Sequence, residues 1–194
     1  PLDIRVVAGI AYREIIEVAA KIRADLIVVG TPRGDILRQV FTGTTAERVM
    51  RLGRMPVLMV RRSARRPYES IFAAVDFSEY SENALDHAQR LGLLDDAMLT
   101  IVHAFVPMAE GLMRYANVEP ARIREHVETK VASVAAKGYP FEVIERAVQR
   151  RGADLVVIGT HGAGAVRRLL FGSVAEEALR KLSCDVLAVP SKAK

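Results

Sequence analysis

Two segments of this 194-residue chain can be laid over one another without a gap. Residues 24–60 read ADLIVVGTPRGDILRQVFTGTTAERVMRLGRMPVLMV, and residues 153–189 read ADLVVIGTHGAGAVRRLLFGSVAEEALRKLSCDVLAV. Each has an apolar run ending in Gly, a turn, an amphipathic stretch, a second Gly followed by Thr or Ser, a helical pattern and a last apolar run. A repeat of this length predicts two tandem copies of one structural unit, related by duplication.

The apolar runs at 26–30 and 155–159 are short, non-alternating and rich in β-branched residues, which is typical of strands buried on both faces. The second copy extends backwards through alternating strand and helix patterns. These patterns predict strands at 71–75 and 98–104 and helices at 81–91, 120–137 and 142–151. We therefore expect an α/β fold: an open, Rossmann-like parallel sheet with helices on both faces.

The first copy is shorter than the second. It enters with a strand pattern at 2–9 and a helical pattern at 11–22, and it lacks counterparts of the two strands predicted at the start of the second copy. The second copy is also compressed, because Gly138 runs almost directly into a helix and leaves room for at most a very short strand. A polar, basic stretch at 62–68 separates the copies. The expected domains are an incomplete one at 1–62 and a nucleotide-binding one at 69–194.

Composition excludes some classes of protein. No apolar run approaches the roughly 20 residues of a transmembrane helix, and the N-terminus lacks the pattern of a secretory signal. The single Cys184 fits a reducing, cytoplasmic setting and is expected to pack as a small apolar residue. The net charge is +5, but the densest basic cluster, at 61–67, has no interleaved aromatic residues to stack on bases. A solvated linker is favoured there over a nucleic-acid site.

The glycines of the second copy have a spacing that suits an anion. Gly159 ends a buried strand, and Gly162 lets the backbone approach a ligand without a Cβ. Gly172 and Ser173 then open a helix whose free N–H groups attract phosphate oxygens. The alternative is that these glycines only serve turns and a helix cap. Neither a P-loop nor a Rossmann glycine fingerprint is present.

Two further side chains are candidates for the same site. Asp76 follows the strand at 71–75, where open α/β sheets place ligands, and could accept hydrogen bonds from ribose or adenine. It could equally cap the next helix together with Ser78. His161 could touch a phosphate, although an exposed position in the turn is the favoured interpretation. Of the adjacent Arg167 and Arg168, at most one could reach a ligand.

The segments VDFSEYSENALDHA, IVHAF, ADLVVIGTHG and FGSVAEEALRKLSCDVLAVP together resemble the universal stress protein family. The pattern G-x2-G-x9-G-[ST] of its ATP-binding branch is met by Gly159, Gly162, Gly172 and Ser173. The resemblance implies a five-stranded parallel sheet with ATP across the strand ends near Asp76. It also implies that backbone near His103 and Ala104 touches adenine and that the glycine loop holds the phosphates.

The first copy departs from this pattern, because Arg33 stands where the second glycine is needed. We therefore expect the nucleotide, namely ATP, ADP or AMP with or without Mg²⁺, in the second copy only. The expected role is a nucleotide-dependent regulatory module in stress response. The alternatives are a slow ATPase, for which His161 and Asp76 are the only candidate catalytic bases and Asp76 is better placed for the nucleoside end, and a nucleotide-free interaction protein. The edge strands at 56–60 and 185–189 are expected to pair antiparallel, and a second chain could complete a homodimer.

Overall fold

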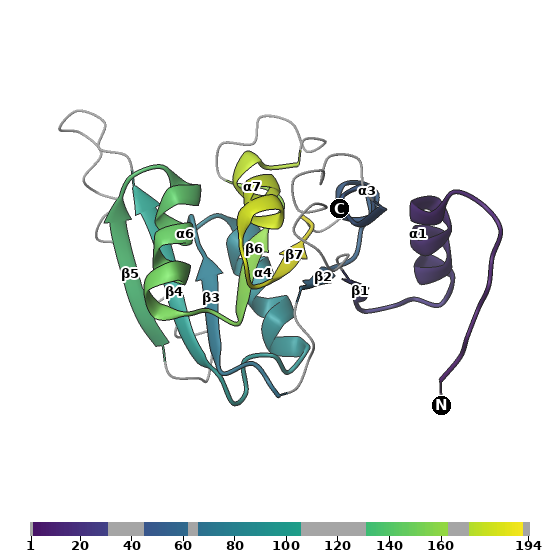
Figure 1. The fold of residues 1–194 in the computed structure, drawn as a ribbon, viewed down its shortest axis with the longest axis horizontal. Helices are drawn as coiled ribbons and strands as arrows, with labels where there is room; N and C mark the ends of the chain where they lie inside the picture. The colour runs from purple at the N-terminus through teal and green to yellow at the C-terminus, as the bar shows by residue number, and fades with distance from the viewer. Residues whose placement is uncertain (1, 31–44, 62–65, 106–130, 163–170, 192–194) are drawn as a thin grey trace.

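The computed structural model describes residues 2–30, 45–61, 66–105, 131–162 and 171–191. Their strands form one seven-stranded sheet in the order β1-β2-β7-β6-β3-β4-β5 (Figure 1). The strands are β1 Ile27–Gly30, β2 Val57–Val60, β3 Ser70–Ala74, β4 Met98–Phe105, β5 Val131–Lys137, β6 Leu155–Gly159 and β7 Asp185–Val189. The helices are α1 Ala11–Lys21, α3 Thr45–Leu52, α4 Glu79–Arg90, α6 Pro140–Arg151 and α7 Ser173–Lys181. Among these strands, every neighbouring pair is parallel except β2 and β7, so the predicted α/β fold is confirmed.

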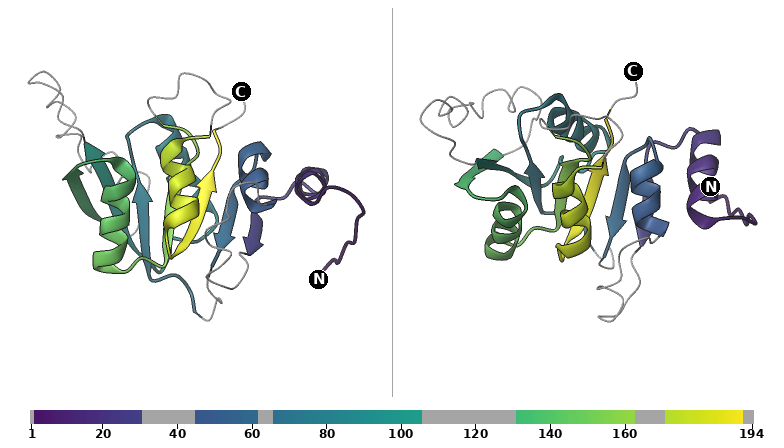
Figure 2. Two further views of the ribbon diagram at one scale, coloured as in Figure 1. Left: turned by 45° about the horizontal axis from the view of Figure 1, so that its top comes forward. Right: turned by 90° about the horizontal axis from the view of Figure 1, so that it is seen from above.

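Helices cover the sheet on both faces. Helices α3, α6 and α7 lie on one side, and α4 lies on the other (Figure 2). Successive strand residues point to opposite faces, so Phe72 and Val156 enter the core under α6 and α7, whereas Ile71 and Leu155 enter the core under α4. This double burial explains why the strand sequences are continuously apolar. Cys184 is fully buried in the first of these cores, as predicted for a small apolar side chain.

The two repeats meet at the antiparallel strands β2 and β7. The register pairs Val57 with Ala188 and Leu58 with Leu187. Leu58 and Leu187 occupy the same position in the two repeats, 129 residues apart, so a local two-fold axis passes between them. The predicted pairing of the last strands is therefore present, and it joins the two halves of the chain into one sheet.

The helix predicted over 120–137 is wrong in its C-terminal part, because residues 131–137 form strand β5. This strand pairs in parallel with the whole of β4, and the gain from that pairing outweighs the helical spacing of the apolar residues. The expected compression of the second copy is also wrong, since β5 is the strand that seemed to lack room. Gly138 turns with a φ of 149°, and Pro140 opens α6 at once. Residues 106–130 lie outside the described part of the chain.

The strand predicted at 2–9 is not formed in the structure. Residues 2–8 carry no strand pairing, and the side chains of Ile4 and Val6 are 79% and 95% exposed. A strand needs a neighbour for its backbone N–H and C=O groups, and none of the described residues supplies one. The helix predicted to follow is confirmed as α1.

Backbone geometry extends the match between the halves further back than the aligned segments. Gly9 and Gly138, again 129 residues apart, have φ angles of 153° and 149°. Arg23 and Gly152, at the same spacing, have φ angles of 52° and 69°. Helix α1 thus corresponds to α6, and residues 2–8 correspond to β5.

Candidate functional site

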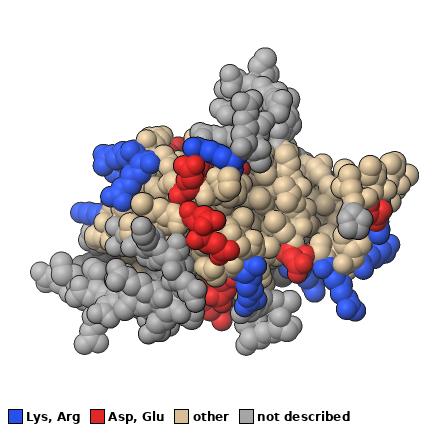
Figure 3. Space-filling view, turned by 90° about the horizontal axis from the view of Figure 1, so that it is seen from below, with Lys and Arg blue, Asp and Glu red and all other residues tan. Residues whose placement is uncertain are grey.

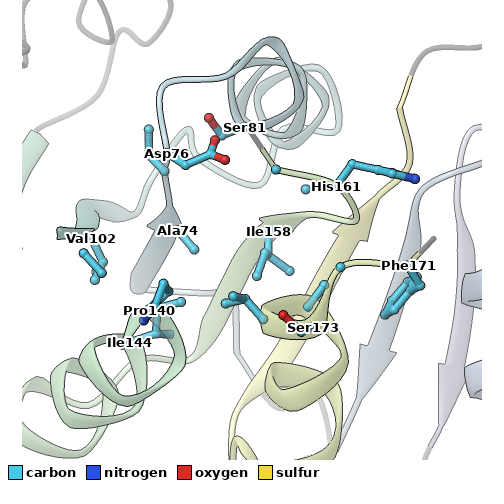
Figure 4. Close-up of a pocket in the computed structure, with 17 residues that line it drawn as sticks. Ala74, Asp76, Ser81, Val102, Pro140, Ile144, Ile158, His161, Phe171 and Ser173 are labelled. Atoms are coloured by element: carbon cyan, nitrogen blue, oxygen red, sulfur yellow. The ribbon is translucent and has the colours of Figure 1, made fainter. Parts of the chain in front are cut away.

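A cavity of about 560 Å³ opens at the carboxyl ends of β3, β4 and β6 (Figure 4). Strand β3 lies between β4 and β6, and the chain crosses to β4 on one side and later to β6 on the other. The crossovers diverge at this point and leave a crevice between them, which is where open α/β sheets bind their ligands. The topology alone therefore makes this cavity the first candidate for a binding site.

Most of the predicted site residues surround this cavity. Those that line it are Asp76, Ala104, Gly159, His161, Gly162, Gly172 and Ser173. His103 is the exception, because its side chain turns back to the backbone: Nδ1 lies 2.8 Å from the carbonyl oxygen of Val75, and the ring packs against Phe77 with centroids 4.7 Å apart. The histidine therefore braces the end of β3 from outside the cavity.

The three glycines are needed for close approach rather than for an unusual backbone angle. A Cβ at Gly159 would lie 3.0 Å from the carbonyl oxygen of Tyr80, and one at Gly172 would lie 3.0 Å from that of Thr160. A Cβ at Gly162 would lie 2.8 Å from Oδ2 of Asp76. None of the three is among the glycines with a left-handed φ. Any larger residue here would push the strand end, the loop and the helix start apart.

Hydrogen bonds tie the two ends of the glycine loop together. The Gly172 N–H donates to the carbonyl oxygen of Thr160 at 2.7 Å, and the Thr160 N–H donates to that of Val189 at 2.9 Å. Residues 163–170, which include Arg167 and Arg168, lie outside the described residues. The end of β6 and the start of α7 are therefore held directly beside one another.

Helix α7 begins at the cavity wall. Its N-cap is Gly172, which offers no side-chain acceptor, and the residues of its first turn, Ser173, Val174 and Ala175, line the cavity. The N–H groups of a first helical turn have no acceptor within the helix. Together with the positive end of the helix dipole, they suit an anionic group in the cavity.

Asp76 supports the start of the next helix, as one of the two roles considered for it requires, and it also borders the cavity. Its Oδ1 accepts hydrogen bonds from the N–H and Oγ of Ser78, at 3.1 and 2.5 Å, and Ser78 is the N-cap of α4. Its other oxygen faces Gly162 across the mouth of the cavity. The next residue, Phe77, has a φ of 59°, which is an uncommon conformation for a bulky side chain and is found most often at functional sites. The carboxylate is thus held in place at the ligand end of β3.

His161 is less exposed than predicted. It is half-buried, its ring lies 5.7 Å from that of Tyr80, and its Nδ1 lies 3.0 Å from Oγ1 of Thr160. Its Nε2 is buried without a partner among the described residues. Figure 4 shows the ring extending away from the cavity and from the other labelled side chains. The backbone of His161, more than its imidazole, is presented to the cavity.

The opposite end of the cavity is apolar, and sequence reasoning missed much of it. Val102, Pro140, Ile144 and Ile158 form this wall, and Phe171 stands beside the helix start. Such a wall suits the flat face of an aromatic ring. Pro140 and Ile144 belong to α6, whose placement against β4 could not be seen while β5 was assigned to a helix. The apolar residues of α6, directly after the strand at 131–137, were the sequence signal that could have predicted this wall.

In the view of Figure 3, most acidic side chains of the described residues lie near the middle of the molecule. Basic side chains lie beside them and toward both ends, so the described residues form no continuous basic patch on this face. No group of three or more His, Cys, Asp or Glu side chains among the described residues is arranged to hold a metal ion. None of the described helices is long and apolar enough to cross a membrane.

These features define an α/β protein with a cavity at the switch point of a parallel sheet, apolar at one end and bounded by a helix N-terminus at the other. The sequence pattern of the universal stress protein family matches residues 2–61 and 67–190. The chain belongs to the universal stress protein family.

Relatives support this assignment. A universal stress protein of Thermus aquaticus is 30% identical over 135 residues, which cover 63% of this chain and 98% of the relative. The crystal structure of a universal stress protein from Archaeoglobus fulgidus has a TM-score of 0.69 at 20% identity and covers 92% of this chain, which spans 64% of that protein's length. A universal stress protein solved in complex with cAMP has a TM-score of 0.51 at 24% identity, covering 66% of this chain and 100% of its own. The two structures share the fold.

Proposed function

We propose that this protein binds an adenine nucleotide in the cavity of its second half and acts in stress response as a nucleotide-dependent regulatory module. ATP is the favoured ligand, with ADP and AMP as shorter alternatives. The observation that carries the proposal is the polarity of the cavity: an apolar wall at one end, and the uncapped N-terminus of α7 with the glycine loop at the other. A nucleotide likewise has a flat, largely apolar base at one end and negatively charged phosphates at the other.

The geometry supports one orientation of the ligand. The adenine ring lies against Val102, Ala104 and Ile144, where it is shielded from water. The ribose hydroxyls then face the carboxylate of Asp76 at the end of β3. The phosphates lie across Gly162 and the first turn of α7. The related fold that was solved with cAMP makes an adenine nucleotide compatible with this architecture.

Binding is favoured over hydrolysis by the surroundings of the two candidate bases. Asp76 already accepts two hydrogen bonds from Ser78, and the imidazole of His161 is engaged with Thr160 and Tyr80. A hydrolase would need a base aimed at a water beside the terminal phosphate. We therefore propose that the protein binds the nucleotide for regulation, and that any hydrolysis of ATP is slow.

We further propose that the chain is of the tandem type, with a first copy that lacks its N-terminal strands and has no nucleotide site. Residues 2–8 correspond to β5, and the first copy has no described counterpart of β3 or β4. Those two strands contribute Asp76 and Ala104 to the cavity of the second copy. The described residues of the first copy match neither of these, and Arg33 replaces the second glycine of its loop, so we expect the nucleotide in the second copy only.

The test is a thermal-shift and calorimetric titration of the purified protein with ATP, ADP, AMP, adenosine and GTP. We expect adenine nucleotides to stabilise the protein, and any ligand extracted after denaturation to have the mass and absorbance of an adenine nucleotide. A protein that is purified free of ligand and shows no shift or heat with any adenine nucleotide would contradict the proposal.

Gly172→Val should weaken ATP binding about 100-fold or more, because the branched side chain meets the Thr160 carbonyl and displaces the helix start from the phosphates. Ser173→Ala is the milder companion. It removes one exposed hydroxyl and should weaken binding about three- to ten-fold with the fold intact. Melting without ligand checks that both variants are folded.

A further inference from the structure

One side chain of the first half reaches the helix that opens at the cavity of the second half. Arg51, near the end of α3, places Nη2 2.9 Å from Oε2 of Glu176 in α7. Its guanidinium carbon also lies 5.9 Å from the centroid of the Phe171 ring. Phe171 precedes Gly172 and Ser173 in the sequence, and Glu176 follows them. Arg51 therefore contacts residues on both sides of the start of α7.

Both partners of Arg51 belong to the proposed phosphate end. Phe171 lines the cavity itself. Glu176 stands in the first turn of α7, where its N–H donates to the carbonyl oxygen of Gly172 at 2.9 Å and forms the first hydrogen bond of the helix. The carboxylate of Glu176 therefore belongs to the same helical turn as the N–H groups of Ser173 and its neighbours, where the phosphates are proposed to bind.

An acidic side chain in that turn stabilises α7 when no ligand is bound, but it opposes the binding of a phosphate. The helix dipole attracts the Glu176 carboxylate, but a bound polyanion is repelled by it. This repulsion acts on each negative charge of the ligand, and a triphosphate carries several charges. The carboxylate must therefore be neutralised for the helix start to serve phosphates well.

The neutralising charges come from matched positions of the two repeats. Glu47 and Arg51 in α3 correspond to Glu176 and Arg180 in α7. Arg180 lies 3.6 Å from Glu176 on its own helix, and Arg51 approaches to 2.9 Å from the other half. Arg51 in turn lies 3.5 Å from Glu47. Four charges thus gather where α3 and α7 meet, and the shortest of these ion pairs crosses between the halves.

We propose that Arg51 is a positioning residue for the phosphates, supplied to the nucleotide site of the second half by the first half. It neutralises Glu176 and supports Phe171, so the first copy contributes to binding although it holds no ligand of its own. This inference rests on the proposed function of the cavity. It adds that the affinity for phosphate depends on how the two halves are docked.

The test compares Arg51→Gln with wild type by calorimetric titration with ATP and with adenosine. We expect ATP to bind about three- to ten-fold more weakly and adenosine to bind equally well, because only the phosphates feel Glu176. Adding Glu176→Gln to this variant should restore ATP affinity, since the charge to be neutralised is then gone. Arg51→Lys should stay within about two-fold of wild type.

Arg48→Gln is the matched control. Arg48 is a neighbouring basic residue of α3 whose guanidinium lies over the Tyr12 ring, 5.1 Å from its centroid. It should leave ATP binding unchanged, which separates the local effect of Arg51 from the loss of one positive charge. If Arg51→Gln changes ATP and adenosine binding alike, or neither, or if Glu176→Gln gives no rescue, the inference is wrong while nucleotide binding stands. If the wild type binds no nucleotide, both proposals fail together.

Discussion

The two halves of this protein share one ungapped sequence pattern but surround it differently, and one pair of glycines shows how. Gly30 ends β1 in the first half, and Gly159 ends β6 at the same place in the second. A side chain at Gly159 would press on the Tyr80 carbonyl at the start of α4, whereas one at Gly30 would meet no described atom within 4 Å. The strand is alike in both halves, but only the second has β3 and α4 beside it.

Matching helices and strands do not by themselves form the cavity. The cavity takes residues from β3, β4, β6, α6 and α7, and the first half retains described counterparts of the last three only. What the first half still offers is its surface, through β2, which continues the sheet, and through α3, which carries Arg51. Its remaining contribution is to the other half's structure and site.

The largest expected difference between the halves is at this pair of glycines. Gly159→Val should lower the free energy of unfolding by about 2–3 kcal/mol, because backbone on both sides must move to admit the side chain. Gly30→Val should change it by less than about 0.5 kcal/mol, since an exposed strand position tolerates Val. Urea denaturation measures both. Equal losses would show that the first half is as tightly enclosed as the second.

A smaller difference is expected at the aspartates that precede β6 and β1. Asp154 accepts hydrogen bonds from the N–H groups of Glu69 and Ser70, each at 3.1 Å, and so ties β6 to the start of β3. Its counterpart Asp25 is exposed. Asp154→Ala should cost about 1–2 kcal/mol, because it leaves two N–H groups without their acceptor. Asp25→Ala should cost almost nothing in the same denaturation experiment, and a cost near that of Asp154 would break the comparison.

The smallest effect concerns two tyrosines whose pKa values move in opposite directions. Burial, strengthened by the Asp185 carboxylate that accepts a hydrogen bond from the Tyr68 hydroxyl at 2.8 Å, raises the pKa of Tyr68. At the surface of α1, the hydrogen bond from Arg13 lowers the pKa of Tyr12. The Tyr68 hydroxyl loses its proton at a lower pH in the unfolded chain than in the folded protein. The free energy of unfolding therefore falls as the pH rises above the ordinary tyrosine pKa of 10.0.

Tyr68→Phe should therefore flatten the loss of stability above about pH 10 relative to wild type, by up to about 1 kcal/mol per pH unit. Tyr12→Phe should not flatten this loss, because a pKa that is lowered in the folded protein makes stability rise rather than fall as the pH approaches 10. Unfolding measured between pH 8 and about 11 would show the difference. Parallel profiles for wild type and Tyr68→Phe would mean that the buried hydroxyl is not protected by Asp185 in solution.

The sequence by itself determined the elements that depend on local pattern. The strands β1 and β6 were predicted from short, continuously apolar runs. The expected burial on both faces is found for β6 but not for β1, where the side chain of Val28 is 58% exposed. The glycine loop was predicted as an anion site from its spacing, and Asp76 was predicted as an acceptor for ribose or adenine from its place after a strand. The pairing of β2 with β7 was predicted from the resemblance to the universal stress protein family, which implies that the last strands of two copies meet across a two-fold axis.

Only the tertiary structure decided the elements whose state depends on a neighbour. Residues 131–137 and residues 2–8 occupy the same place in the repeat, yet the first are a strand beside β4 and the second are unpaired. A strand is stabilised by backbone hydrogen bonds to another segment, so no local pattern could separate the two. The apolar wall at Ile144 and the reach of Arg51 to Glu176 depend in the same way on how distant segments pack.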